Sequence, residues 1–253
     1  MPYAPLRTTL PLFLLGLSLV GLPAHVRAAT QQGRQLDVDI ACLDRLHIGV
    51  GHDLKDRIET TGPWPAGIQA TTSADGTIHL TRPTCPTKPE TLDITTPSAM
   101  ALSIRNAGNA SMTLDDRTGP AAVRVGNGPA RLGRAEELDV LSEGTGAITI
   151  PLLDTSARIH STGSADVTIE KADAKALALY LGGSSSFVMQ TGHVQALEIT
   201  SASTRDAVFH GESAITALHV LGKGSILVDR ATGTLATERD GPGKILVNTS
   251  AQP

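Results

Sequence analysis

Aromatic residues are scarce in this chain of 253 residues, with one Trp, two Tyr and three Phe, or 2% of the sequence. Carbohydrate-binding surfaces commonly use aromatic platforms, so few such platforms are expected here. After the N-terminal segment only Trp64, Tyr180, Phe187 and Phe209 remain. Phe187 and Phe209 fall in apolar columns expected to form the core. Trp64 lies between two prolines and is expected on a loop, either as a ligand contact or as a packing residue.

The chain also lacks an excess of positive charge. It has 21 basic and 25 acidic residues, a net charge of −4. Loss of Arg7 and Arg27 with the predicted leader would leave 19 basic residues against 25 acidic ones, a net charge of −6. Because phosphate binding needs a basic face, nucleic acid is excluded as the main partner.

The N-terminus has the pattern of a signal peptide over residues 1–28. Arg7 is followed by the apolar run Leu10–Leu22, which is shorter than the roughly 20 residues that span a bilayer. Val26 and Ala28 are small residues placed for cleavage between Ala28 and Ala29. No later run is long enough to span a bilayer. The mature protein is therefore expected in the periplasm, secreted or at the cell surface, and an uncleaved membrane anchor is the alternative.

Cysteine is limited to two residues, Cys42 and Cys85. In an exported protein an even count predicts one disulfide. The bridge would close a loop of about 40 residues and stabilise the fold by roughly 3–4 kcal/mol. No C-x-x-C motif is present and no His stands at ligand spacing from either Cys, so a metal or redox centre is disfavoured.

From residue 100 onward one unit recurs: an alternating strand, a Gly/Ser-rich turn and a second alternating strand. Apolar residues within each strand are two apart, which is typical of a strand with one buried face. The members of the second apolar column recur at a mean spacing of 19 residues. The first column is Ile104, Val125, Val140, Ile159, Leu179, Ile199, Val220 and Thr237, and the second is Leu114, Leu132, Ile150, Ile169, Met189, Phe209, Val228 and Val247.

This repeat predicts an all-β fold, a single-stranded β-solenoid of coils of about 19 residues that stack like over like. Crossover chirality favours a right-handed parallel β-helix. Residues 97–253 are expected to form the solenoid repeats, and residues 29–96 an N-terminal β cap with the first coil near 91–95. A sandwich of hairpins is the rival architecture. The glycines of the turns are expected to provide positive φ angles, namely Gly108, Gly128, Gly146, Gly163, Gly183 and Gly224.

Three features resemble the GIN-domain family, described as putative autotransporter-adhesin heads. They are the leader followed by the strand-rich Leu46–Val50, the Leu92–Pro97 segment that leads into Leu102–Ile104, and the Gly/Ser-turn repeat, clearest in Ser161–Ile169. The resemblance covers nearly all of the mature chain and implies the solenoid architecture and adhesion. It supplies no catalytic motif. Because no membrane-barrel segment is seen up to Pro253, surface display by the autotransporter route is not expected.

No catalytic motif is evident and no cofactor is expected. One weak candidate surface site consists of Asp206, His210 and Glu212, with His193 and His219 in adjacent coils. His210 and Glu212 would point outward where Phe209 points inward, as an acid/base or metal site would need. No distinctive ligand spacing is present, so an exposed polar strand end is the favoured alternative.

Three functions remain open. The first is a non-enzymatic envelope protein, an adhesin-like or scaffold module that binds through an extended solenoid face. Its partner would be an envelope or extracellular polysaccharide or a protein. The second is a carbohydrate-active enzyme, a polysaccharide lyase or hydrolase, which requires converging carboxylates. The third is a self-associating structural protein, a homo-oligomer with an apolar outward patch.

Overall fold

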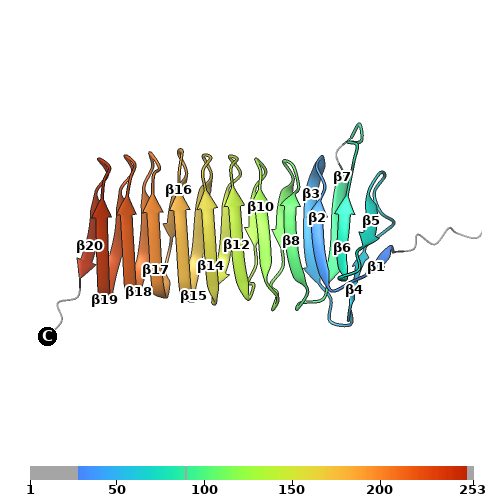
Figure 1. Cartoon of the computed structure of the whole chain (residues 1–253), viewed down its shortest axis with the longest axis horizontal. Coiled ribbons are helices and arrows are strands. Elements are labelled where there is room, and N and C mark those ends of the chain that lie inside the picture. Colours follow the sequence, from blue (N-terminus) through green and yellow to red (C-terminus); the bar gives the residue numbers. More distant parts are fainter. Residues whose placement is uncertain (1–27, 89, 250–253) are drawn as a thin grey trace, which may run out of the picture.

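The computed structural model describes residues 28–88 and 90–249 and shows an elongated all-β solenoid (Figure 1). Parallel coils of about 19 residues stack along the rod, so the predicted fold class is confirmed. Apart from Ala28, the predicted signal peptide lies outside the described residues. Within them, no helix has the length and apolar character needed to span a membrane.

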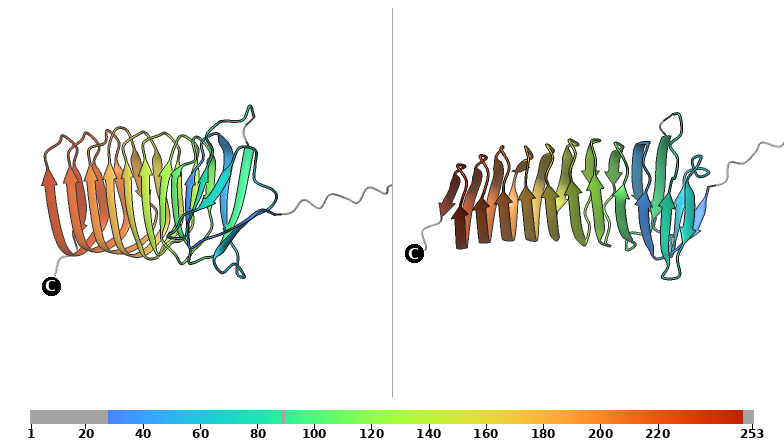
Figure 2. Two further views of the ribbon diagram at one scale, coloured as in Figure 1. Left: turned by 45° about the vertical axis from the view of Figure 1, so that its right-hand side comes forward. Right: turned by 45° about the horizontal axis from the view of Figure 1, so that its top comes forward.

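Two parallel ladders run along the rod, and each coil contributes one strand to each ladder (Figure 2). Ladder A contains β6 (Thr77–Thr81), β2 (Gln35–Asp39), β8 (Ala101–Asn106), β10 (Ala121–Val125), β12 (Glu137–Ser142) and β14 (Ser156–Ser161), followed by the C-terminal parts of β15 (Asp166–Leu181), β17 (Gly192–Ser201), β18 (Ala207–Val220) and β19 (Ile226–Arg239). Ladder B contains β7 (Glu90–Thr96), β3 (Leu43–Val50), β9 (Ser111–Leu114), β11 (Ala130–Leu132) and β13 (Ile148–Leu153), followed by the start of β15, β16 (Ser186–Met189), the starts of β18 and β19, and β20 (Ile245–Thr249).

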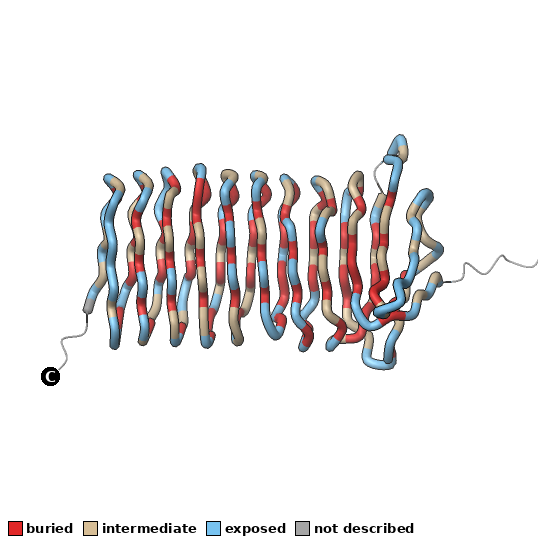
Figure 3. Tube along the Cα trace, viewed as in Figure 1, coloured by how far each residue is buried: buried red, intermediate tan, exposed pale blue. Residues whose placement is uncertain are grey.

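Residues alternate between the interior and the surface along most strands of the two ladders (Figure 3). The second predicted column forms the interior of ladder B: Ile150 pairs with Ile169, and the series continues through Met189, Phe209, Val228 and Val247. Phe187 and Phe209 are fully buried, as predicted. Like residues thus stack over like, which builds a continuous apolar core.

The first predicted column is wrong at two positions. Ile104 pairs with Val123 rather than Val125, and Ile199 pairs with Leu218 rather than Val220. A shift of two residues along a strand keeps the same face inward. The predicted and the actual members of the column are therefore all buried, namely Val123, Val125, Leu218 and Val220.

The coil formed by residues 35–50 lies out of sequence order. β2 pairs with both β6 and β8, and β3 pairs with both β7 and β9. The first coil of the chain is therefore inserted between the coil of residues 77–96 and the coil of residues 101–114 (Figure 1). The sequence predicts an N-terminal β cap over residues 29–96 with the first coil near 91–95, and it does not anticipate that residues 35–50 form an inserted coil.

Antiparallel strands cover the N-terminal end of the rod. β1 (Thr30–Gln32) pairs with β4 (Arg57–Thr60), β4 pairs with β7, and β5 (Gln69–Thr72) pairs with β6. The predicted disulfide is present, with the Cα atoms of Cys42 and Cys85 5.7 Å apart. It joins the turn between β2 and β3 to the segment between β6 and β7, so it links the inserted coil to the coil beside the cap.

Most of the turn glycines have a different role from the one expected. Of the six named, only Gly108 and Gly183 have φ angles in the left-handed region, at 60° and 58°. The others are needed because stacked turns approach closely. A Cβ atom on Gly163 would lie 2.1 Å from the carbonyl oxygen of Gly144 in the coil below. Cys42, at φ 66°, takes the left-handed position in its own turn.

Asp37 connects the inserted coil to both neighbours. It is 7% exposed and accepts hydrogen bonds from Arg105 Nε and Nη2 at 2.7 and 2.8 Å. His79 Nδ1 lies 2.9 Å from its second oxygen. Burial alone would raise the pKa of Asp37, but the hydrogen bonds from Arg105 and His79 outweigh burial and hold that pKa below its usual range. The carboxylate thus bridges three consecutive coils in its charged form.

We expect Gly163→Ala to destabilise the fold by about 1–3 kcal/mol, because the added methyl group forces the stacked turns apart. Urea unfolding followed by circular dichroism measures the change. The neighbouring Thr162→Ala, at an exposed position, should have little effect. Equal unfolding midpoints for the two variants would show that the turns do not need close backbone approach.

We expect Asp37→Asn to lower the free energy of unfolding by about 1–3 kcal/mol at neutral pH, since it weakens charge-assisted hydrogen bonds. The pKa of Asp37 is lower in the folded state, so its contribution is complete above the unfolded value of about 3.9. It disappears as pH falls through the folded pKa. Urea midpoints of wild type and variant should therefore converge in acid. Asp44→Asn, at an exposed position of β3, is the control and should show no such convergence.

Candidate functional site

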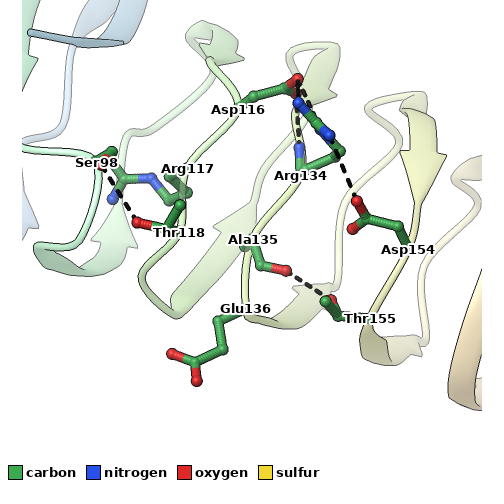
Figure 4. Close-up of a pocket in the computed structure, with 9 residues that line it drawn as sticks. All are labelled: Ser98, Asp116, Arg117, Thr118, Arg134, Ala135, Glu136, Asp154 and Thr155. Carbon is green, nitrogen blue, oxygen red and sulfur yellow. Dashed lines mark hydrogen bonds and ion pairs between the residues drawn. The ribbon is translucent and has the colours of Figure 1, made fainter. Parts of the chain in front are cut away.

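One hollow lies at a corner of the solenoid, with a volume of about 380 Å³ (Figure 4). Three of its charged side chains, Asp116, Arg134 and Asp154, pair across successive coils. Arg134 donates from its backbone N and Nε to Asp116 at 2.9 and 2.8 Å, and its Nη1 lies 3.5 Å from Asp154. The backbone hydrogen bond from Arg134 and the adjacent guanidinium lower the pKa of Asp116 despite partial burial. These ion pairs therefore stabilise the stack, and the three paired side chains have few hydrogen-bonding groups free for a ligand.

Arg117 borders the same hollow but points into the protein. It is 5% exposed and donates to Thr96 Oγ1 at 2.8 Å and to the carbonyl oxygen of Met100 at 3.2 Å. Burial lowers the pKa of Arg117 to about 10, and the charge of Asp115 only partly offsets this effect. Its contacts hold the segment between β7 and β9, which is a structural role.

The structure brings part of the predicted surface site together. His193, His210 and Glu212 line one depression of about 380 Å³ with Asp229 and Arg230. His210 Nδ1 lies 3.3 Å from both carboxylate oxygens of Asp229, and Glu212 forms an ion pair with Arg230. Glu212 is therefore already neutralised and His210 already partnered, so this depression has few groups free for chemistry.

The remaining predicted residues lie elsewhere. The Asp206 carboxylate accepts a hydrogen bond from the backbone N of Ser225 at 2.7 Å, which fixes a turn. Trp64 is half-buried and packs against the core in the cap region. His219 lies on ladder A, where its Nε2 is 2.9 Å from Asp240 and 4.0 Å from Glu238. The predicted site is thus distributed over four places.

The outward surface of ladder A, here called the tyrosine face, carries two continuous columns of side chains. Strand pairing places like positions of successive coils side by side. The first column is Arg124, Leu141, His160, Tyr180, Thr200, His219 and Glu238, and the second is Ala122, Asp139, Arg158, Ala178, Glu198, Ala217 and Ala236. Over six steps of about 4.8 Å the face is roughly 29 Å long.

A stacked aromatic pair lies in the middle of the tyrosine face. The rings of His160 and Tyr180 have centroids 4.5 Å apart and an interplanar angle of 8°. The alanine side chains of the second column are short, and this leaves a depression on each side of the aromatic pair. One, of about 440 Å³, includes Ala122 and Leu141, and the other, of about 430 Å³, includes Ala217 and His219.

Sequence reasoning did not identify Tyr180 or His160 as surface residues of interest. The signal was present, because Leu179 and Leu181 flank Tyr180 and are buried. A period of two then places Tyr180 outward. Its pairing with His160 also required the register of β14 against β15.

The fold has counterparts among solved structures. A crystal structure of a putative adhesin from Parabacteroides distasonis ATCC 8503 has a TM-score of 0.62 and 16% identity, over 89% of this chain and 97% of that chain. A crystal structure of a putative adhesin from Bacteroides fragilis NCTC 9343 has a TM-score of 0.54 and 20% identity, over 89% of this chain and 98% of that one. At these identities the likeness shows the fold alone.

No protein-family model matches the sequence, and no curated protein matches it. The resemblance to the GIN-domain family therefore stays a prediction.

Proposed function

We propose that this protein is an exported, non-enzymatic, adhesin-like module that binds an extended polysaccharide along the tyrosine face. The observation that carries the proposal is the stacked pair of His160 and Tyr180 between two depressions on one regular face. The names of the two structural neighbours agree with an adhesin-like role. The predicted signal peptide and the disulfide agree with a location outside the cytoplasm.

The periodicity of the face favours a polymer over a small molecule. Each coil repeats the same two outward positions, so a chain of repeating units meets similar groups at successive steps. The aromatic pair offers an amphipathic surface with a hydroxyl at its edge. Asp139, Arg158 and Glu198 lie in the neighbouring column and can exchange hydrogen bonds with hydroxyl groups.

The spacing of acidic residues on the two columns supports binding without hydrolysis. Asp139 and Glu198 are three coils apart, which corresponds to about 14 Å. Paired carboxylates of glycosidases are typically about 5–10 Å apart. Glu238 and Asp240 are closer to each other, but His219 lies against both of them.

We expect Tyr180→Ala to weaken polysaccharide binding by about tenfold or more, since a central aromatic contact typically contributes at least 1–2 kcal/mol. The measurement is binding of the purified protein to an array of envelope and extracellular polysaccharides. Thr168→Ala on the outward surface of ladder B is the control and should bind like wild type.

The same wells are assayed for released reducing or unsaturated sugar ends. Release by the wild type would overturn the non-enzymatic part of the proposal and support a carbohydrate-active enzyme. Binding that Tyr180→Ala and Thr168→Ala leave equally intact would overturn the assignment to the tyrosine face. An absence of binding to every polysaccharide would favour a protein partner.

Self-association is the second candidate, and one observation favours it. The outward surface of ladder B carries an apolar column of Val188, Val208, Leu227 and Leu246, the last of which is 52% exposed. Apolar side chains aligned at the surface are typical of contact sites between chains.

If this column joins two copies, sedimentation velocity should show a dimer that forms with rising concentration. Leu227→Ser combined with Leu246→Ser should shift the chain to monomer, because it removes the centre and end of the column. Ser186→Ala, at a partly exposed position on the same ladder, should leave the equilibrium unchanged. A wild type that stays monomeric at all concentrations would refute this candidate.

A further inference from the structure

His219, Glu238 and Asp240 form a compact cluster at the C-terminal end of the tyrosine face. One ligand atom from each residue lies within 4.8 Å of the other two. The closest contact joins His219 Nε2 and Asp240 Oδ2 at 2.9 Å, and Glu238 Oε2 lies 4.0 Å from the same nitrogen. Both carboxylates therefore converge on a single nitrogen of the imidazole.

The backbone of the solenoid holds these residues in place. Parallel pairing of β18 with β19 sets His219 directly beside Glu238. Asp240 follows β19 in a turn, and its backbone N donates to the carbonyl oxygen of Val220 at 2.9 Å. All three residues are thus attached to paired strands or to a hydrogen-bonded turn. Rigid elements position ligands more precisely than free loops do.

We infer that His219, Glu238 and Asp240 bind a divalent transition-metal ion, with zinc as the best fit. One imidazole nitrogen with two carboxylate oxygens is a ligand set that suits zinc. The imidazole disfavours calcium and magnesium, which prefer ligand sets made of oxygen alone. The ligand atoms need only small shifts to reach zinc distances of about 2.0–2.2 Å.

Three protein ligands leave at least one coordination position for water. His219 and Glu238 also line the depression on the C-terminal side of Tyr180. The open position can therefore face that depression. The partly exposed His219 and the exposed carboxylates give the ion direct access from solvent.

The site of His210 offers a matched control within the same molecule. It also joins β18 to β19 through a histidine and an aspartate, with His210 Nδ1 3.3 Å from Asp229. The neighbouring Glu212 is engaged by Arg230. His210 thus has one carboxylate partner, whereas His219 has two.

The test is titration calorimetry of tag-free protein with zinc chloride, followed by calcium and magnesium chlorides. We expect one zinc ion per chain and at least tenfold weaker binding of calcium and magnesium. His219→Ala should abolish zinc binding, while Glu238→Gln and Asp240→Asn should each weaken it by at least tenfold. His210→Ala should bind zinc like wild type. Circular dichroism verifies that each variant is folded.

Zinc binding that His219→Ala leaves unchanged would overturn the proposal, as would binding that His210→Ala abolishes. A wild type that binds no zinc would overturn it as well. Tighter binding of calcium than of zinc would show that the carboxylates act without the imidazole, which also contradicts the proposed ligand set.

Discussion

Parallel pairing between successive coils, at a separation of about 4.8 Å, is the constraint on which the rest of this structure depends. It requires every coil to present equivalent residues at equivalent places, so the interior accepts only columns of matching shape such as Ile150, Ile169 and Met189. It also brings the turns so close that glycine is needed for space, as Gly163 shows against Gly144 in the preceding coil. The apolar core and the turn composition are therefore two consequences of one hydrogen-bonding pattern.

The same constraint generates the outer surface. Once the interior positions are fixed, every second residue must point outward, and outward residues also fall into columns. A single aromatic substitution in one coil would give an isolated ring, but His160 and Tyr180 occupy neighbouring positions of one column and stack. A single histidine likewise becomes part of a cluster when acidic residues occupy the next coil, as with His219 beside Glu238. Function can thus be added to a solenoid by changes at exposed positions that leave the core untouched.

The repeat, its period and the interior column of ladder B could be predicted because apolar residues recur at a nearly constant spacing. Register at Leu218 and Val220 could not, because both are apolar, both are buried and they are two residues apart. Pairing Val220 with Thr237 would have set His219 beside Ala236, whereas the actual pairing of Leu218 with Thr237 sets it beside Glu238. The error of two residues was harmless for the fold, yet it concealed the cluster of His219, Glu238 and Asp240. The residues that meet at a surface site of a solenoid depend on the strand register. The periodicity of the core alone leaves that register ambiguous by two residues.

The inserted coil was unpredictable for a different reason, since periodicity assumes that neighbours in sequence are neighbours in the stack. Residues 35–50 pair on one side with residues 77–96 and on the other with residues 101–114. An edge that would otherwise stay open at the start of the repeats is thereby paired, and a further coil and antiparallel strands close the end. Asp37 connects this coil to both neighbours through His79 and Arg105, and the Cys42–Cys85 bridge ties it to the coil beside the cap. Because the inserted coil is shared, the cap cannot separate from the repeats without breaking parallel pairing on both ladders, and the N-terminal end is bound into the same cooperative unit as the first repeats.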